Sequence, residues 1–84
     1  MINVLFFARI REQLGRSAME IEFTSSLETV GALQAQLVEL GGETWAGVLQ
    51  AENVLRAVNQ EEAGLDSELR DGDEVAFFPP VTGG

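Results

Sequence analysis

The stretch "DGDEVAFFPPVTGG", residues 71–84, contains the clearest structural signals in this chain of 84 residues. Its first tripeptide, 71–73, is a tight-turn pattern, and residues 74–78 are rich in Val and Phe, as is typical of a β-strand. Proline has no backbone N–H and holds φ near −65°, so Pro79-Pro80 ends that strand. The sequence therefore predicts a final strand over 74–78, followed by a short stalk that leaves the sheet.

The first strand is predicted at the other end of the chain. Residues 2–7, "INVLFF", are apolar at nearly every position, as expected of a strand covered on both faces. Alternation assigns these side chains to two faces: Ile2, Val4 and Phe6 to one, Leu5 and Phe7 to the other. By the same rule Val75 and Phe77 face the helix, whereas Phe78 lies on the side of Leu5 and Phe7.

The segments between these strands predict two hairpin-like units and a helix. Residues 8–17 form a polar connection with at most one helical turn, and residues 17–23, "SAMEIEF", alternate as a second, antiparallel strand. A third strand is expected over 54–58, and the residues 59–64 that follow it are turn-prone.

One strong helix is predicted within residues 24–42. Its apolar residues recur at i, i+3, i+7 and i+10 and are Val30, Leu33, Leu37 and Leu40. Thr29 is a suitable N-cap, with Ser25 and Glu28 as a competing capping box, and Gly41-Gly42 is a stop signal. Residues 43–53 favour a short second helical segment.

The order of elements is β-β-α-β-β, which predicts an α+β fold with a mixed sheet packed on one main helix. A right-handed crossover through the helix places the first and last strands side by side and parallel in the centre of the sheet. Residues 1–78 then form the domain, and residues 79–84 form a flexible, protruding C-terminal tail.

Composition excludes several classes of function. The chain has no Cys and no His, which removes thiolate nucleophiles, disulfides, zinc clusters and the usual proton shuttle at neutral pH. Fourteen acidic residues, five arginines and no lysine give a formal charge of −9, which argues against nucleic acid and favours protein partners with basic surfaces. The carboxylates of Glu61-Glu62 and of 71–74 are interpreted as solvated turn residues, so no metal is expected.

No apolar run approaches the ~18 residues of a membrane span. The N-terminal apolar run lacks a preceding basic segment and a small-residue cleavage site, so it is interpreted as a strand and not as a signal peptide. We therefore expect no membrane association and a cytoplasmic location.

Four blocks of this sequence resemble the ubiquitin-like β-grasp sulfur carriers, and in particular the small subunits of molybdopterin synthase. They are "VLFFARIRE" (4–12), "TVGALQAQL" (29–37), "AVNQ" (57–60) and "LRDGDEVAFFPPVTGG" (69–84). The last block is the most specific. Gly31 departs from the pattern, because it occupies a position where a residue with high helix propensity is expected.

The resemblance implies a role for the chain terminus. In such carriers the residue equivalent to Gly84 is adenylylated by an ATP-using, ubiquitin-activating-like adenylyltransferase and becomes a thiocarboxylate with sulfur from a donor protein. The tail then enters the active site of the large synthase subunit, within a heterotetramer, and gives its sulfur to cyclic pyranopterin monophosphate to form the molybdopterin dithiolene. The tail residues expected to enter partner sites are Pro80, Val81, Thr82, Gly83 and Gly84.

The resemblance also implies that this chain binds no cofactor and contributes no catalytic residue of its own. Elementary chemistry supports the sequence of steps, because an α-carboxylate is an anion at pH 7 and a poor electrophile until it is joined to AMP. Glycine brings no Cβ into a narrow channel, and the prolines reduce the conformational freedom lost when the stalk is threaded.

A partner interface is expected at Phe7, Phe78 and Pro79, where an apolar patch beside the stalk would be a docking surface. The alternative is that loops cover this patch. Arg9 and Arg11 are either partner contacts or ordinary surface charges.

Other functions remain open at this stage. Within the same fold, the chain is alternatively a sulfur carrier for another pathway, such as thiamine synthesis, or a ubiquitin-like protein modifier. From a different class, it is a binding module whose terminus is not reactive. The block "FFPPVTGG" (77–84) favours the first function over these.

Overall fold

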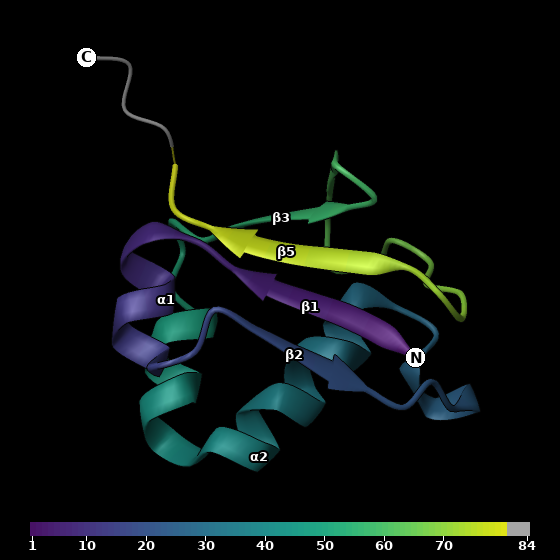
Figure 1. The fold of residues 1–84 in the computed structure, drawn as a ribbon, viewed down its shortest axis with the longest axis horizontal. Helices are drawn as coiled ribbons and strands as arrows, with labels where there is room; N and C mark the ends of the chain where they lie inside the picture. Colours follow the sequence, from purple (N-terminus) through teal and green to yellow (C-terminus); the bar gives the residue numbers. More distant parts are fainter. Residues whose placement is uncertain (81–84) are drawn as a thin grey trace.

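The fold is built on a mixed sheet, seen in the computed structural model, which describes residues 1–80 (Figure 1). Its strands are β1 (Ile2–Phe6), β2 (Ala18–Ile21), β3 (Leu55–Val58), β4 (Glu61–Ala63) and β5 (Glu74–Phe78). They are arranged in the order β2-β1-β5-β3-β4. Two helices, α1 (Ala8–Leu14) and α2 (Val30–Leu49), pack on one face of this sheet.

The central strand pair is β1 and β5, which run parallel with Val4 opposite Val75 and Phe6 opposite Phe77. These four side chains are at most 1% exposed, because they face the helices. Both the predicted central position of this pair and the predicted assignment of its faces are confirmed. The other face of the sheet, called the open face below, is not covered by helices (Figure 1).

The main helix contributes Val30, Leu33 and Leu37 to the core, each 0% exposed. The predicted core position of Leu40 is wrong, since this side chain is 62% exposed. At about 100° per residue, Leu40 points roughly 80° away from Val30, whereas Gly41 points only about 20° away. Gly41 therefore occupies the core-facing position.

Trp45 fills the space that Gly41 leaves. Its indole lies so close that a Cβ on Gly41 would be 2.0 Å from the Trp45 Cγ. The same indole makes an edge-on contact with Phe6, with ring centroids 5.7 Å apart. Gly41 is thus required by close packing.

The neighbouring Gly42 interrupts α2 with φ 74° and ψ −159°, a backbone conformation that is nearly restricted to glycine. The predicted break at Gly41-Gly42 is confirmed, and so is the predicted second helical segment, which continues to Leu49. At the start of α2, the Oγ1 of Thr29 accepts a hydrogen bond from the Ala32 N–H at 3.1 Å. Thr29 is therefore the N-cap, and the competing start is a separate 3-10 turn, η1 (Ser25–Leu27).

Gly31 is explained by a loop that crosses the start of α2. Its N–H donates to the carbonyl oxygen of Leu65 at 2.8 Å. A Cβ at this position would lie 3.1 Å from the same oxygen. The departure from helix propensity therefore allows close approach of two backbone segments.

The connection after β1 is more helical than predicted. It forms the seven-residue helix α1, which buries Ile10 and Leu14 and ends at Gly15 with φ 73°. The i, i+4 spacing of these two apolar residues is the signal that the prediction of a polar connection missed. Within residues 1–80, no helix is both long and apolar enough to cross a membrane.

Residues 59–64 were predicted as a turn, but they contain both a turn and the start of a further strand. Asn59 and Gln60 have φ of 49° and 71° and form a two-residue hairpin loop. The chain then returns as β4, which pairs antiparallel with β3. The predicted strands 17–23 and 54–58 are shorter in the structure, at Ala18–Ile21 and Leu55–Val58.

Candidate functional site

The candidate site is the end of the sheet where the chain leaves β5. Because β1 and β5 are parallel, both strands end here, and the N–H of Phe7 donates to the carbonyl oxygen of Phe77 at 3.1 Å. Phe7 and Phe78 thus lie next to each other, and Phe78 is paired on its other side with Leu55 of β3. Pro79 and Pro80 follow directly, and Figure 1 shows β5 leading to this end of the molecule, away from the N-terminus.

The surface beside the stalk is apolar and accessible. Phe7 is 44% exposed, Phe78 and Pro79 are half-buried, and Pro80 is exposed. The apolar side chains on this part of the open face are Leu5, Phe7, Leu55, Ala57, Ala76 and Phe78. We call this set the apolar end of the open face. No loop of residues 1–80 buries the exposed ring of Phe7, so this ring is available for contact.

The backbone fixes the position of Phe7. Ala8, the next residue, has φ 53°, a left-handed conformation that costs a non-glycine residue roughly 1–2 kcal/mol. Phe7 itself is extended, and its carbonyl oxygen accepts from the N–H of Ile10 at 3.1 Å. The sharp change of direction at Ala8 places α1 under the sheet while Phe7 stays on the open face.

Arg56 supports the same end of the sheet from the helix side. Its Nε donates to the Oε1 of Gln34 at 2.7 Å, and its terminal nitrogens donate to the carbonyl oxygens of Val54 and Leu49 at 3.1 and 3.0 Å. The guanidinium lies 5.9 Å from the centre of the Phe77 ring. Desolvation by burial lowers the pKa of Arg56 below its ordinary value.

These contacts join Gln34 near the start of α2 and Leu49 at its end to β3 and β5. Sequence reasoning missed this role of Arg56. The available signal was its inward position, since alternation along β3 places Arg56 on the same face as Val58.

A groove of about 520 Å³ lies between α1 and the second half of α2, with Pro79 at its edge. Arg9 lines this groove, whereas Arg11 does not. Arg9 therefore lines the same groove as Pro79, the first residue of the stalk.

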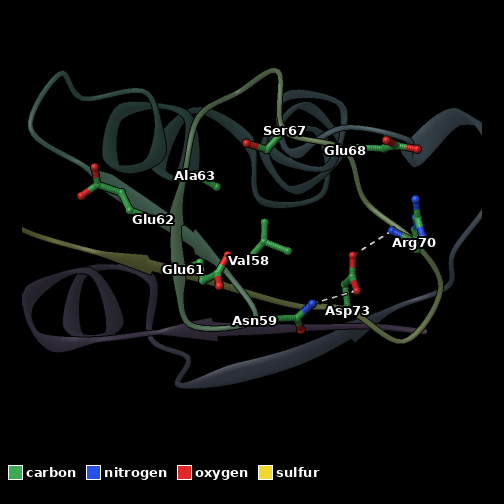
Figure 2. A pocket seen from close by; sticks show the side chains of 9 residues that line it. All are labelled: Val58, Asn59, Glu61, Glu62, Ala63, Ser67, Glu68, Arg70 and Asp73. Carbon is green, nitrogen blue, oxygen red and sulfur yellow. Dashed lines mark hydrogen bonds between the residues drawn. The ribbon is translucent and has the colours of Figure 1, made fainter.

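A second depression, of about 590 Å³, lies at the opposite end of the sheet (Figure 2). The carboxylate of Asp73 accepts two hydrogen bonds there, from the Asn59 Nδ2 at 3.0 Å and from the Arg70 backbone N–H at 2.8 Å. The Oδ1 of Asn59 accepts from the Glu74 N–H at 3.0 Å. These polar groups connect the β3–β4 turn to the turn before β5, so their role is structural.

Among residues 1–80, no group of three or more Asp, Glu, His or Cys side chains is arranged to hold a metal ion. The remaining predicted site residues, Val81, Thr82, Gly83 and Gly84, lie outside the described residues.

Charge is distributed unequally between the two ends. Segments 20–28 and 61–74 contain ten of the fourteen acidic residues and one of the five arginines, and so account for the whole formal charge of −9. Both segments gather toward the end where β1 and β5 begin, since the Asn3 N–H donates to Asp73 and the Leu69 N–H donates to Glu28. The residues outside these two segments have a net formal charge of zero. The end of the sheet at which the stalk begins belongs to them.

Comparison with solved structures defines the class of protein. SAMP1 from Haloferax volcanii superposes with a TM-score of 0.77 at 26% identity, covering 99% of this chain and 98% of that one. A protein–protein complex of subunits 1 and 2 of molybdopterin-converting factor from Helicobacter pylori 26695 contains a chain that superposes with a TM-score of 0.69 at 26% identity. That match covers 99% of this chain and 97% of the other. The fold is the ubiquitin-like β-grasp, as predicted.

Sequence comparison then gives the family. The family model described as ThiS family matches residues 4–84, and this chain belongs to that family. The molybdopterin synthase sulfur carrier subunit of Escherichia coli (strain K12) is 49% identical over 84 residues, which is the full length of both chains. The predicted resemblance to these carriers is confirmed.

Proposed function

We propose that this chain is the sulfur carrier subunit of a molybdopterin synthase. The observation that supports this most strongly is the 49% identity to the Escherichia coli carrier subunit, in a match that spans the full length of both chains and so extends through the stalk to the C-terminus. The geometry agrees with the proposal, because an exposed apolar surface lies where the stalk begins.

The proposed chemistry begins at the α-carboxylate of Gly84. An oxygen of this carboxylate attacks the α-phosphate of ATP on an adenylyltransferase, and pyrophosphate leaves. Hydrosulfide supplied through a donor protein then attacks the acyl carbon, the bond from this carbon to the AMP oxygen breaks, and AMP leaves the thiocarboxylate. Both groups are anions at pH 7, but sulfur is larger and more polarisable than oxygen, so the sulfur of the thiocarboxylate is a better nucleophile than the carboxylate oxygen that it replaces.

The stalk delivers this sulfur to a second protein. Six residues, 79–84, reach at most about 20 Å beyond the sheet. In the proposal, Pro80, Val81, Thr82, Gly83 and Gly84 enter the active site of the large subunit, where the sulfur passes to cyclic pyranopterin monophosphate. The chain itself binds no cofactor, and ATP is used only by the adenylyltransferase, in the cytoplasm.

Docking to the large subunit is assigned to the apolar end of the open face, with Phe7 and Phe78 in this set and Pro79 directly beside it. Aromatic side chains that become fully desolvated contribute most of the binding energy in such interfaces. The Helicobacter pylori complex of subunits 1 and 2 supports a partner of this kind, because one of its chains shares the fold of this one.

Mass spectrometry of the protein isolated from its own cells tests the proposal. A fraction heavier by one oxygen-to-sulfur exchange, located on the C-terminal peptide, is expected. A variant lacking Gly84 is the control and should show no such fraction. An unmodified terminus under conditions of active cofactor synthesis would contradict the proposal, and a covalently attached protein would indicate a modifier instead.

A further inference from the structure

The turn before β5 contains Asp71–Gly72, a pair of residues in which backbone isomerisation is faster than in other sequences. In this reaction the glycine nitrogen attacks the carboxyl carbon of the aspartate side chain, a C–O bond of the carboxyl group breaks, and water leaves a succinimide ring. A second water molecule then opens the ring at either carbonyl carbon, which gives aspartate or isoaspartate. Glycine favours the attack because no side chain shields its nitrogen.

The backbone of the turn requires this reactive pair. Gly72 has φ 96°, a conformation that residues with a side chain rarely adopt. No atom lies within 4 Å of the position that a Cβ on Gly72 would take, so no neighbour shields this side of the residue. The side chain of Asp71 is 68% exposed. Both reacting groups are therefore accessible to water, and replacing the glycine would strain the turn.

Met1 contacts both reacting groups. The Gly72 N–H donates to the carbonyl oxygen of Met1 at 3.0 Å, and the amino group of Met1 forms an ion pair with the carboxylate of Asp71. Before the Gly72 nitrogen attacks, it must lose the proton that it shares with Met1. An exposed ion pair contributes little, so the hydrogen bond to the Met1 carbonyl is the main obstacle to the reaction.

The parallel arrangement of β1 and β5 fixes the position of this carbonyl. Both strands begin at the same end of the sheet, and the Asn3 N–H donates to the carbonyl oxygen of Asp73 at 2.9 Å. Figure 1 shows the N-terminus at this end, beside the turn before β5. Ile2, which follows the Met1 carbonyl, is 0% exposed. The carbonyl therefore stays next to Gly72 even when the exposed side chain of Met1 moves.

We infer that Asp71–Gly72 is a latent site of backbone isomerisation, and that the contacts of Met1 prevent the reaction in the folded chain. Isoaspartate would add one methylene group to the main chain, inside a turn that the Asp73 N–H closes on the carbonyl oxygen of Arg70 at 3.1 Å. Because β5 begins at the next residue, Glu74, the product would lose the first pairing of β5 with β1. The inference does not depend on the proposed function.

Labelling in water enriched in oxygen-18 tests the inference. Each passage through the succinimide introduces one heavy oxygen atom at residue 71, which mass spectrometry of the surrounding peptide detects. The full-length chain is compared when folded and in urea. Two altered chains follow: an N-acetylated chain, which loses the charge but keeps the Met1 carbonyl, and a chain that begins at Ile2, which loses both. Asp66–Ser67 is the internal control, because its Ser67 N–H is bonded within its own loop. Thermal melting verifies that the altered chains fold.

We expect labelling at residue 71 to be at least about tenfold slower in the folded chain than in urea. Acetylation should change the rate in the folded chain by less than about twofold, because an exposed ion pair is weak. Removal of Met1 should raise it by about fivefold or more, with labelling at Asp66 unchanged.

Three results would overturn the inference. Equal rates in the folded chain and in urea would show that the fold gives no protection. An unchanged rate in a folded chain without Met1 would show that other contacts protect the turn. Absence of label at residue 71 in urea would show that this pair of residues is not an isomerisation site.

Discussion

The two ends of the sheet use polar and apolar groups in opposite ways. At the end shown in Figure 2, the side chains of Asn59 and Asp73 hydrogen-bond to the chain itself, so this end is locked although it is densely charged. At the stalk end, Phe7 exposes 44% of its surface and has no covering segment in the described structure. The comparison shows that exposed groups without a partner in the chain indicate a binding site, whereas a high density of charged residues does not.

The largest effect is expected from adding one alanine after Gly84. The addition lies beyond every core residue, so the fold and the docking step should be unchanged. Loading and transfer of sulfur should fall by at least about a hundredfold, because the reacting atom moves by about 3.5 Å and even 1 Å of misplacement has a cost of that size. Thiocarboxylate yield with the cognate adenylyltransferase measures this, alongside binding to the large subunit. Normal loading without prior trimming of the alanine would exclude Gly84 as the reacting residue.

At the stalk end, Phe78→Asp should weaken binding to the large subunit by about thirtyfold or more, since it places a charge in a desolvated contact. Its melting temperature should change little, because the half-buried ring lies on the open face and outside the core cluster. Isothermal titration and thermal melting measure the two effects. A large loss of stability with normal binding would show that Phe78 belongs to the core.

At the opposite end, Asn59→Ala should produce the reverse pattern. It removes the hydrogen bonds to Asp73 and to the Glu74 N–H, and it replaces an asparagine that tolerates φ 49°. We expect a loss of about 1–3 kcal/mol in the free energy of unfolding with unchanged affinity for the large subunit. Chemical denaturation gives the first quantity. A strong loss of affinity in the folded variant would place the turn end in the interface.

The smallest effect is expected from two glycines of α2. At Gly47 a Cβ would meet nothing within 4 Å, so Gly47→Ala should raise the free energy of unfolding by about 0.5–1 kcal/mol. Gly31→Ala should not give this gain, because its Cβ would lie 3.1 Å from the Leu65 oxygen. Urea denaturation gives the free energy of unfolding of both variants, and the difference between them measures the cost of placing a Cβ against the Leu65 loop. Equal stabilisation by both would show that the loop moves away at no cost.

Much of the fold follows from local patterns in the sequence. The central strands, the Thr29 cap and the break at Gly42 are recognisable because each depends on a few neighbouring residues. One error, the position of Leu40, concerns tertiary context, whereas the missed β4 concerns an unusual turn sequence. Leu40 is exposed because Trp45 packs over Gly41, and β4 forms because an Asn-Gln pair adopts a hairpin conformation more common for Asn-Gly.

The candidate site was predictable to a similar degree. The positions of Phe7 and Phe78 on the open face follow from strand alternation alone. The support from Arg56 depends on its neighbours in space, because Gln34 of α2 and Phe77 of β5 reach it only in the folded chain. Contacts between residues so far apart in the sequence come from the tertiary fold, which no local pattern contains.

The central claim is that the terminal residue donates sulfur while the folded domain positions it. A single-turnover reaction of thiocarboxylated protein with the large subunit and cyclic pyranopterin monophosphate tests this most directly. Mass spectrometry follows the C-terminal peptide while product is quantified. We expect sulfur to disappear from Gly84 as product forms, with two carrier chains consumed per dithiolene, because a dithiolene contains two sulfur atoms and each tail supplies one. Product formation while Gly84 keeps its sulfur would contradict the account.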